Sequence, residues 1–573
     1  MHLKSRSLLA LAVGSLSLAA CGGGGGGAAV APPVAPLELR PVTMSITVPA
    51  AGAPFIVPRD ARRAGGVARR PAYVSPGTTQ VAVFINGSAS AAAVVPLPPA
   101  GGSPATRDVT LNAPNGVDTF RVDLRDAVGV QLATGTVTQD VSVNNIVAVT
   151  TLGIPAMAVF GVADAQRRPA SGTPAVIPLN LTVTDADGFA ITGTFSHQVT
   201  VVATPPGILG YTESTRFVTN AAQAAALTVA YNGAPNRGDV FATLNDSQDP
   251  KDAVADAVFR PGALPAGRNA LVAFNTGATS TLKLVDTSSY AQAAVTGGSL
   301  AANVTALAAA PNGTTAYAGL TNGNLAVYDG ATKAVTGTVN LSSTTVNGLT
   351  FDDRASHAYA VVTRPAGFGV ADILVQINTS VAFVALPAAA TACAGIAENS
   401  RVVWVSCSNA TYRVDMQTAV VTALSPSTGG AAIAEYFSPG LIYATYPVGL
   451  IGAFPGPSTT TLAAPASIAL PGATVPIGLA LDPSQRFLYV GANNAIVTLR
   501  VKPDGTGTPV RSVATASGLT THLVDFPGSA SRAPDATVWG TTSSGALLVL
   551  DTATNTIVQN IAFPGISDVV FVP

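Results

Sequence analysis

The sequence predicts an all-β protein, because three of its features favour strands and turns over helices. The chain of 573 residues is 48% hydrophobic but only 10% charged, and it contains 56 glycines and 42 prolines. Val and Thr, which suit a pleated sheet, recur in short runs that end at turn residues. The C-terminal half also repeats with a period of roughly 40 residues, which is typical of propeller blades. We therefore expect two immunoglobulin-like β-sandwiches, over residues 42–153 and 154–262, and then a seven-bladed β-propeller over residues 267–573.

The first segment has the features of a secretion signal over residues 1–20. Lys4 and Arg6 precede an apolar run that is too short to span a bilayer comfortably. This run ends in Leu-Ala-Ala-Cys at residues 18–21, which resembles the bacterial lipobox. The resemblance implies cleavage before Cys21 and attachment of lipid to its thiol. The alternative is an ordinary leader that happens to contain a cysteine.

Residues 21–41 are expected to form a tether between the lipid and the folded protein. A run of glycines over residues 22–27 is followed by a segment rich in Ala and Pro. Such a composition does not pack and behaves as a flexible linker. Gly22, where an Asp would stand in an inner-membrane protein, resembles the outer-membrane sorting pattern of Gram-negative lipoproteins. We expect a lipid-anchored envelope protein in the outer membrane, on its periplasmic face or on the cell surface.

Short alternating segments with turn signals between them indicate the two sandwiches. The strands expected in the first sandwich are residues 42–49, 80–86, 91–97, 106–111, 119–126, 130–138 and 143–150. Those expected in the second are residues 177–184, 198–203, 225–231 and 240–245. Asn86-Gly87 and Asn115-Gly116 are typical turn sequences between strands.

The repeat in the C-terminal half is clearest in two copies. Residues 304–319 read VTALAAAPNGTTAYAG, and residues 476–493 read PIGLALDPSQRFLYVGAN. A third strand ending in Asp follows, as in LAVYDGAT at residues 325–332 and LLVLDTATN at 547–555. These segments resemble the YVTN-type β-propeller repeat. The resemblance implies that Tyr side chains fill the space between sheets and that the Asp fixes the turn after the third strand.

Counting the repeats predicts how the propeller closes. Blades are expected to start near residues 303, 346, 393, 431, 476 and 519, which gives six complete blades. Residues 269–296 then supply three strands without an inner one, and residues 566–572 supply a single inner strand. Joining these two ends completes a seventh blade and removes the free sheet edges.

Two cysteines remain after lipidation, Cys393 and Cys407, on either side of a polar turn. If the hairpin is symmetric about Ser400, the two residues lie opposite each other and within disulfide reach. An exported protein meets an oxidising compartment, which favours the bond. A pair of buried free thiols is the alternative. The spacing is not that of a zinc site, and we expect no metal and no cofactor.

Residues that could carry chemistry are scarce. The candidates for a polar channel lining are Glu435, His522 and Asp525, and no catalytic residue is assigned. Other acidic residues on or beside the inner strands are Asp352, Asp353, Asp482 and Asp568, of which Asp352 and Asp482 are expected to be turn formers. Asp185-Ala186-Asp187-Gly188 lacks the remaining ligands of a calcium loop and is expected to be a turn.

The distribution of charge limits the classes of molecule that the protein is expected to bind. A net charge of −1 does not indicate a surface that binds nucleic acid. A local cluster of Arg59, Arg62, Arg63, Arg69 and Arg70 indicates either a solvated loop, which we favour, or a contact with an anionic surface. We expect a binding or scaffolding module for a protein or glycan partner, attached to the membrane through its lipid, and favour this over an enzyme. The alternatives are a hydrolase of the propeller lactonase type and an inert envelope scaffold.

Overall fold

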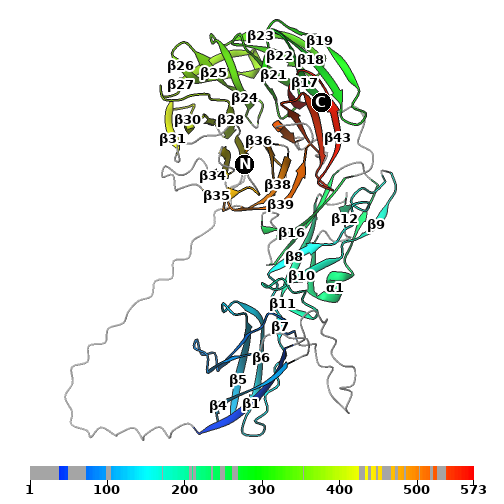
Figure 1. Ribbon diagram of the computed structural model, residues 1–573, viewed down its shortest axis with the longest axis vertical. Helices are drawn as coiled ribbons and strands as arrows, with labels where there is room; N and C mark the ends of the chain where they lie inside the picture. The colour runs from blue at the N-terminus through cyan, green and yellow to red at the C-terminus, as the bar shows by residue number, and fades with distance from the viewer. Residues whose placement is uncertain are drawn as a thin grey trace, which may run out of the picture.

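The computed structural model is built almost entirely of β-strands (Figure 1). It describes residues 38–48, 73–97, 105–170, 172–204, 209–210, 215–233, 237–244, 252–260, 269–352, 354–399, 401–424, 433–436, 441–446, 450–454, 466–471, 475–482, 486–493, 495–502, 504–515, 520–525 and 537–572. Among these residues, the one α-helix is α1 (Ala221–Ala225). No helix in the described ranges is long and apolar enough to cross a membrane.

The first region packs a two-stranded sheet against a larger one. β1 (Leu39–Val48) runs antiparallel to β4 (Ala105–Pro114), with Val42 opposite Leu111 and Met44 opposite Val109. These four side chains are buried, because residues two apart on a strand face the same side. The larger sheet contains β2 (Gln80–Ile85), β3 (Ala93–Pro96), β5 (Val117–Arg125) and β6 (Gln131–Asp140).

The larger sheet continues into the second region through β7 (Leu152–Gly153). This short strand pairs with β6 on one side and with β11 (Thr194–Thr204) on the other. The path of the sheet is therefore β16-β15-β11-β7-β6-β5-β2-β3, with β13 also paired to β11. The remaining strands of the second region are β8 (Met157–Phe160), β9 (Ala175–Pro178), β10 (Leu181–Thr184), β12 (Leu209–Gly210), β13 (Thr215–Asn220), β14 (Thr228–Tyr231), β15 (Gly238–Thr243) and β16 (Ala255–Phe259).

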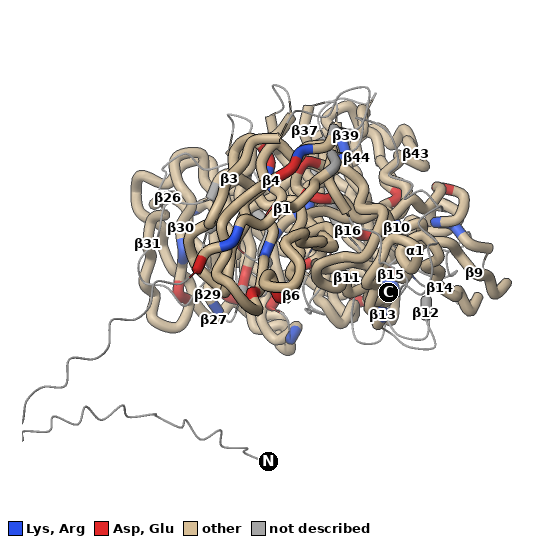
Figure 2. Tube along the Cα trace, turned by 90° about the horizontal axis from the view of Figure 1, so that it is seen from below, with Lys and Arg blue, Asp and Glu red and all other residues tan. Residues whose placement is uncertain are grey.

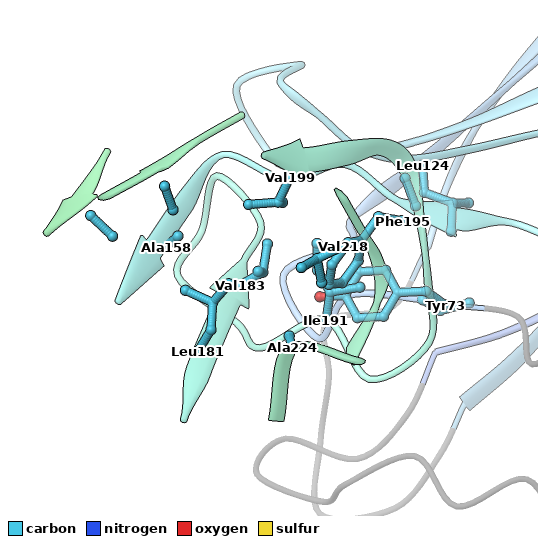
Figure 3. Packing of buried hydrophobic residues seen from close by; sticks show 14 of the residues in the cluster. Tyr73, Leu124, Ala158, Leu181, Val183, Ile191, Phe195, Val199, Val218 and Ala224 are labelled. Carbon is cyan, nitrogen blue, oxygen red and sulfur yellow. The ribbon is translucent and has the colours of Figure 1, made fainter. Parts of the chain in front are cut away.

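One hydrophobic core also spans both regions. Figure 3 shows Leu124 and Tyr73 of the first region beside Phe195 and Val218 of the second, all within one buried cluster. The boundary expected between residues 153 and 154 thus falls inside a shared sheet and a shared core. The sequence does not reveal this connection, because β7 is only 2 residues long.

The last strand expected in the first region is absent. Residues 143–150 contain a turn and an irregular segment, with one isolated parallel bridge between Thr43 and Ile146. The aliphatic residues of this segment imitate a strand pattern, but Val143 is 83% exposed. The carboxylate of Asp140 accepts a hydrogen bond from the backbone N–H of Ser142, which favours a turn here.

Two details of the second region also differ from the prediction. The strand expected over residues 177–184 is divided into β9 and β10 by Asn180, whose φ of 46° is left-handed. The strand expected over residues 225–231 begins only at Thr228, as β14, and the helix α1 precedes it and ends at Ala225. The helix begins because the side chain of Asn220 accepts the backbone N–H of Gln223, as a helix N-cap does.

The C-terminal half consists of antiparallel sheets in which strands pair in chain order. Five sheets have four strands each, and one path of eight strands joins two further runs of four by a single parallel bridge between Thr296 and Ala334. The first strands of the sheets are β20 (Val304–Ala309), β24 (Thr345–Phe351), β28 (Gly395–Asn399), β32 (Ile433–Tyr436), β36 (Pro476–Leu481) and β40 (Thr520–Asp525). Each begins within two residues of a blade start that the repeat predicts.

The other strands complete these sheets. The second strands are β21 (Thr315–Leu320), β25 (His357–Arg364), β29 (Val402–Ser406), β33 (Leu441–Tyr446), β37 (Phe487–Ala492) and β41 (Thr537–Thr542). The third strands are β22 (Asn324–Asp329), β26 (Gly367–Leu374), β30 (Thr411–Asp415), β34 (Leu450–Phe454), β38 (Ala495–Val501) and β42 (Ala546–Asp551). The fourth strands are β23 (Ala334–Asn340), β27 (Thr379–Ala385), β31 (Val420–Leu424), β35 (Ala466–Ala469), β39 (Gly507–Ala514) and β43 (Thr556–Ala562).

The two ends of the C-terminal half meet in one sheet. β44 (Ile566–Val572) pairs antiparallel with β17 (Asn269–Thr276), which is followed by β18 (Thr279–Asp286) and β19 (Gln292–Leu300). β44 contacts β20 and β40, and successive first strands contact one another all the way round. Asp568 on β44 also accepts the backbone N–H of Leu307 on β20 at 2.6 Å. The C-terminal half is therefore a β-propeller whose ring is closed between its last and first segments.

Tyrosines on the second strands fill the space between neighbouring sheets. Tyr317 is fully buried and stacks on Phe351 of the next sheet, with ring centroids 5.1 Å apart. Its hydroxyl donates to the Asn378 side chain at 2.6 Å, and burial raises its pKa to about 12. Tyr489 is 1% exposed in the equivalent repeat. This is the packing role that the sequence resemblance predicts for these residues.

Candidate functional site

The propeller has two faces, because consecutive strands of each sheet alternate in direction. Turns between first and second strands, and between third and fourth strands, lie at one end of every sheet. Turns between second and third strands, and the connections from one sheet to the next, lie at the other end. We name the first end the seam face and the second end the open face.

Aspartates fix turns on the seam face. Asp286, which ends β18, accepts the Ser288 hydroxyl at 2.6 Å and the Ser289 backbone N–H at 2.8 Å. The Ser288 hydroxyl is the main reason that the pKa of Asp286 is lowered to about 2. Asp329, which ends β22, accepts the Thr332 N–H at 2.7 Å, and this bond lowers its pKa. The sequence predicts this turn role for Asp329.

The second region contacts the seam face through buried ion pairs. Arg237 Nη1 lies 2.7 Å from Asp482 Oδ2, and both side chains are at most 1% exposed. Asp256 of β16 pairs with two propeller arginines, with Arg486 Nε at 3.1 Å and Arg500 Nη2 at 2.8 Å. With Asp239, which binds Arg237 and Arg486, three arginines and three aspartates balance in charge. We name these six residues the seam cluster.

A second group of contacts lies beside the seam cluster. The buried carboxylate of Asp551 is 2.6 Å from Arg168 Nη2 and 2.9 Å from Arg260 Nη1, both from the second region. Arg167 donates to the carbonyl of Ala553 at 3.3 Å. Val258 of β16 joins the apolar cluster between two sheets of the propeller. Because buried charges need their partners at fixed positions, these contacts hold the propeller in one orientation on the second region.

Asp482 therefore has a role that the sequence prediction missed. The sequence places it in a Pro-containing turn, and a local turn role was expected. Its partner Arg237 is distant in sequence, so no local pattern could have indicated the ion pair. Asp352, the matching residue of another blade, does fix its turn by accepting the backbone N–H groups of Ser356 and His357.

The open face is almost free of charge in the turns and connections that the structure describes. Its one charged residue there is Arg364, which donates to the Leu341 carbonyl at 2.9 Å and lies over the ring of Phe383. The rest of the polar surface is made of hydroxyls and amides. It includes Asn303, Thr321, Asn322, Ser343, Thr344, Thr391, Ser408, Asn409, Asn493, Ser543 and Ser544.

One connection of the open face is fastened to a neighbouring turn. We name residues 386–394 the pinned loop. A disulfide joins Cys393 to Cys407, whose Cα atoms are 3.9 Å apart. Asn409 donates from Nδ2 to the Ala389 carbonyl at 2.7 Å and accepts the Thr391 N–H at 3.2 Å. This loop is thus held by covalent and polar links, with much of its outer surface exposed.

The hairpin that carries the cysteines differs slightly from the symmetric one expected. β28 and β29 pair Gly395 with Ser406, so the centre of the hairpin falls between residues 400 and 401. Cys407 is then in line with Ala394, and the two cysteines are offset by one residue. The disulfide joins the two cysteines despite this offset of one residue.

The candidate channel residues lie on two first strands of the ring. Glu435 is on β32, paired with Ile442, and His522 and Asp525 are on β40, paired with Thr541 and Val538. β36 lies between these two strands in the ring. The side chains of all three residues lie outside the described part of the structure.

Several other residues singled out in the sequence are outside the described ranges. They are the signal with Lys4 and Arg6, the lipidation site Cys21, the glycine run, Asp353 and the arginine cluster of Arg59, Arg62, Arg63, Arg69 and Arg70. Asp185, by contrast, is described. It accepts the N–H groups of Asp187 and Phe189 and the hydroxyl of Tyr73, as a turn residue does.

His357 and Asp372 form a pair at the seam face that the sequence did not indicate. His357 Nδ1 is 2.7 Å from Asp372 Oδ1, and Arg401 of the next sheet is 3.6 Å from the other carboxylate oxygen. Within the described ranges, no three His, Cys, Asp or Glu side chains come together as metal ligands would.

Comparison with known proteins gives structural likeness only. No protein family description and no curated protein matches the sequence. Among solved structures, a periplasmic gluconolactonase of Pseudomonas aeruginosa matches with a TM-score of 0.43 and 16% identity, over 53% of this chain and 99% of that chain. The Cps50 (Swd1) β-propeller domain of Myceliophteria thermophila matches with a TM-score of 0.40 and 12% identity, over 50% and 96% of the two chains.

Proposed function

We propose that this protein is an envelope lipoprotein whose propeller binds a protein or glycan partner through its open face. The observation that carries the proposal is the set of buried ion pairs on the seam face. They fasten one face of the propeller to the second region and leave the other face directed away from it. Such an arrangement suits presentation of a rigid surface at a distance from an anchor.

The proposal includes a seven-bladed propeller of the YVTN type. Its support is the closed series of first-strand contacts from β20 through β24, β28, β32, β36 and β40 to β44 and back. The eight-stranded path would then be two adjacent blades linked at their outer strands by the Thr296–Ala334 bridge. The two N-terminal regions would be immunoglobulin-like sandwiches that share a sheet through β7.

The anchoring part of the proposal places lipid on Cys21. Each buried methylene of an acyl chain contributes about 0.8 kcal/mol, so two or three chains hold a protein stably at a membrane. In a Gram-negative host fed an alkyne-labelled fatty acid, the wild-type protein should acquire the label and Cys21→Ala should not. Equal labelling of the two proteins would refute the anchor. Fractionation of the envelope then tests whether the labelled protein is in the outer membrane.

The binding part of the proposal rests on the chemistry of the open face. Hydroxyls and amides recognise partners by hydrogen bonds, and a rigid surface loses little conformational entropy when it binds. Glycan hydroxyls and protein backbones both offer suitable donors and acceptors. The pinned loop is the part of this surface that a disulfide and the side chain of Asn409 hold in place.

Affinity capture from a solubilised envelope extract tests this part. Asn322→Arg with Ser408→Arg places two charges on exposed open-face positions, and Ala331→Arg with Gln417→Arg places two charges on exposed seam-face positions as a matched control. We expect the same partner with the wild type and the control, and its loss with the open-face variant. Equal capture by all three proteins would contradict the assignment of the open face.

An enzyme assay on the same samples separates binding from catalysis. Hydrolysis of cyclic esters should not exceed the uncatalysed rate. Turnover that disappears in Glu435→Gln or His522→Ala would instead support the hydrolase and replace the binding proposal.

A further inference from the structure

The end of the molecule opposite the propeller exposes a group of aliphatic side chains. Leu39 is 58% exposed, Val117 68%, Val143 83% and Ile146 65%. Single exposed aliphatic residues are normal on protein surfaces, but several at one end need an explanation. We name these four residues the apolar tip.

Hydrogen bonds hold the backbone segments of the apolar tip together. The Asn115 N–H donates to the Glu38 carbonyl at 2.8 Å, which ties the turn before Val117 to the start of β1. The Val141 N–H donates to the Gly116 carbonyl at 2.8 Å, which ties the turn before Val143 to the same place. The Thr43 N–H donates to the Asn145 carbonyl at 2.9 Å, beside Ile146. Three segments of the chain therefore form one surface.

The charged groups of this surface already have partners within it. Glu38 accepts the Asn115 amide at 3.1 Å, and Asp140 accepts the Ser142 N–H at 2.9 Å. Arg40 donates to the Ser142 carbonyl at 3.4 Å. Figure 2, which views the molecule from below, shows both basic and acidic residues along the trace around β1, β4 and β6. These polar and charged groups flank the aliphatic side chains, and such a mixture suits the boundary between lipid headgroups and acyl chains.

The position of the apolar tip indicates what covers it. Figure 1 places β1 and β4 at the far end of the molecule from the propeller, and β1 begins at Leu39, within the tip. The tether was predicted over residues 21–41, but its last three residues belong to β1. The remaining part, residues 22–37, connects this point to the proposed lipid on Cys21. A flexible chain of that length has an end-to-end distance of about 20–24 Å. The lipid anchor would therefore keep the tip within reach of the bilayer at all times.

We infer that the apolar tip docks on the lipid surface, with its four aliphatic side chains at the boundary between headgroups and acyl chains. This inference rests on the proposed lipid anchor and extends it, because it gives the anchored protein an orientation. The first and second regions, joined by one sheet and one core, then hold the propeller away from the membrane.

A fluorescence experiment on the full lipidated protein tests the inference. A single cysteine introduced by Val143→Cys carries an environment-sensitive dye, and Val381→Cys, at a propeller position that is 51% exposed, is the matched control. Cys393 and Cys407 are bonded to each other and should not react. The proteins are bound to phosphatidylcholine vesicles that contain a nitroxide-labelled lipid. We expect at least about threefold stronger quenching at residue 143 than at residue 381.

A second variant keeps the inference testable if the dye disturbs the tip. Leu39→Ser with Val117→Ser, Val143→Ser and Ile146→Ser removes the apolar surface, and Val381→Ser with Val420→Ser and Val510→Ser is the matched propeller control. A dye on an Asn144→Cys background should then lose its quenching in the tip variant and retain it in the control.

The outcomes separate the inference from the proposed anchor. If the protein does not float with vesicles at all, the anchor fails and the inference falls with it. If it floats but residue 143 is no better quenched than residue 381, the anchor stands and the docking inference is overturned. It is also overturned if residue 143 is shielded only after an envelope extract is added, because the occupant of the tip is then a protein.

Discussion

The seam face and the open face of the propeller are built from the same strands but differ in chemistry. The seam face carries aspartates and arginines that fix turns and bind the second region, and its most important pairs are almost fully buried. The open face carries hydroxyls and amides, with one charged residue in the segments that the structure describes. The contrast teaches that charge is used here for internal fixation, and that the described turns and connections of the other face are nearly neutral.

The largest expected effect of a single substitution lies on the seam face. Asp256→Asn leaves the half-buried Arg500 beside a neutral amide, and it leaves the buried Arg486 with Asp239 as its remaining carboxylate partner. Breaking a buried ion pair by removing one partner typically costs about 3–5 kcal/mol. We expect a loss of this size in the free energy of unfolding, measured with urea, and cleavage by protease between the second region and the propeller.

An exposed open-face residue provides the control for this substitution. Ser543→Ala should change the free energy of unfolding by no more than about 0.5 kcal/mol, because this exposed residue lies in a turn of the open face. If Asp256→Asn and Ser543→Ala had equally small effects, the buried ion pairs would not be what fixes the propeller.

Removal of the disulfide should have the next largest effect on the free energy of unfolding. It tests the contrast between the two faces on the open face. Cys393 and Cys407 are 14 residues apart in sequence. Closing a loop of this size stabilises a protein by about 3 kcal/mol in the chain-entropy description. Cys393→Ser with Cys407→Ser should lower the melting temperature and weaken partner capture, while the contacts of the seam face remain.

Thiol titration checks the premise of that prediction. The denatured, unreduced mature protein should show no reactive thiol from these two residues. Two reactive thiols would show that Cys393 and Cys407 are not bonded and that no disulfide holds the pinned loop.

Asn409→Ala should have a smaller effect on stability but a distinct effect on binding. The amide of Asn409 links the turn after β29 to Ala389 and Thr391 of the pinned loop. Losing two hydrogen bonds of this kind costs about 1–2 kcal/mol. Partner affinity should fall, whereas affinity that stays at the wild-type value would show that the loop does not meet the partner.

The smallest expected effect is the contribution of a turn aspartate to the dependence of stability on pH. The pKa of Asp286 is lowered to about 2 by its serine hydrogen bonds, below the ordinary value of 3.8. A lowered pKa in the folded protein contributes stability that is present above the ordinary value and is lost as the pH falls towards 2. Urea unfolding should therefore show a decline between about pH 4 and pH 2 that is smaller in Asp286→Asn. An unchanged decline would mean that other groups cause it.

The repeated part of the fold could be predicted well from the sequence. Each first strand begins close to its predicted residue, and β44 pairs with β17 as the strand count requires. Repetition makes this possible, because a weak pattern in one blade is supported by the same pattern in others. The tyrosines and turn aspartates are equally local, and Tyr317 and Asp329 have the roles expected from their place in the repeat.

Features that depend on distant partners could not be predicted. Asp482 occupies a standard turn position, and nothing near it in sequence indicates Arg237. Residues 143–150 have the aliphatic content of a strand, but in the structure they form one isolated bridge to β1, between Thr43 and Ile146, and Val143 is left exposed. The candidate channel residues Glu435, His522 and Asp525 could be placed on first strands by the repeat, although their side chains lie outside the described residues.

Photo-crosslinking in the native envelope tests the central claim most directly. A photoreactive amino acid is placed at Asn322 or Ser408 on the open face, and at Lys333 or Asp504 on the seam face, all of which are exposed. We predict one crosslinked partner from the open-face positions and none from the seam-face positions. Equal yields from both faces, or adducts from the seam face alone, would contradict the account.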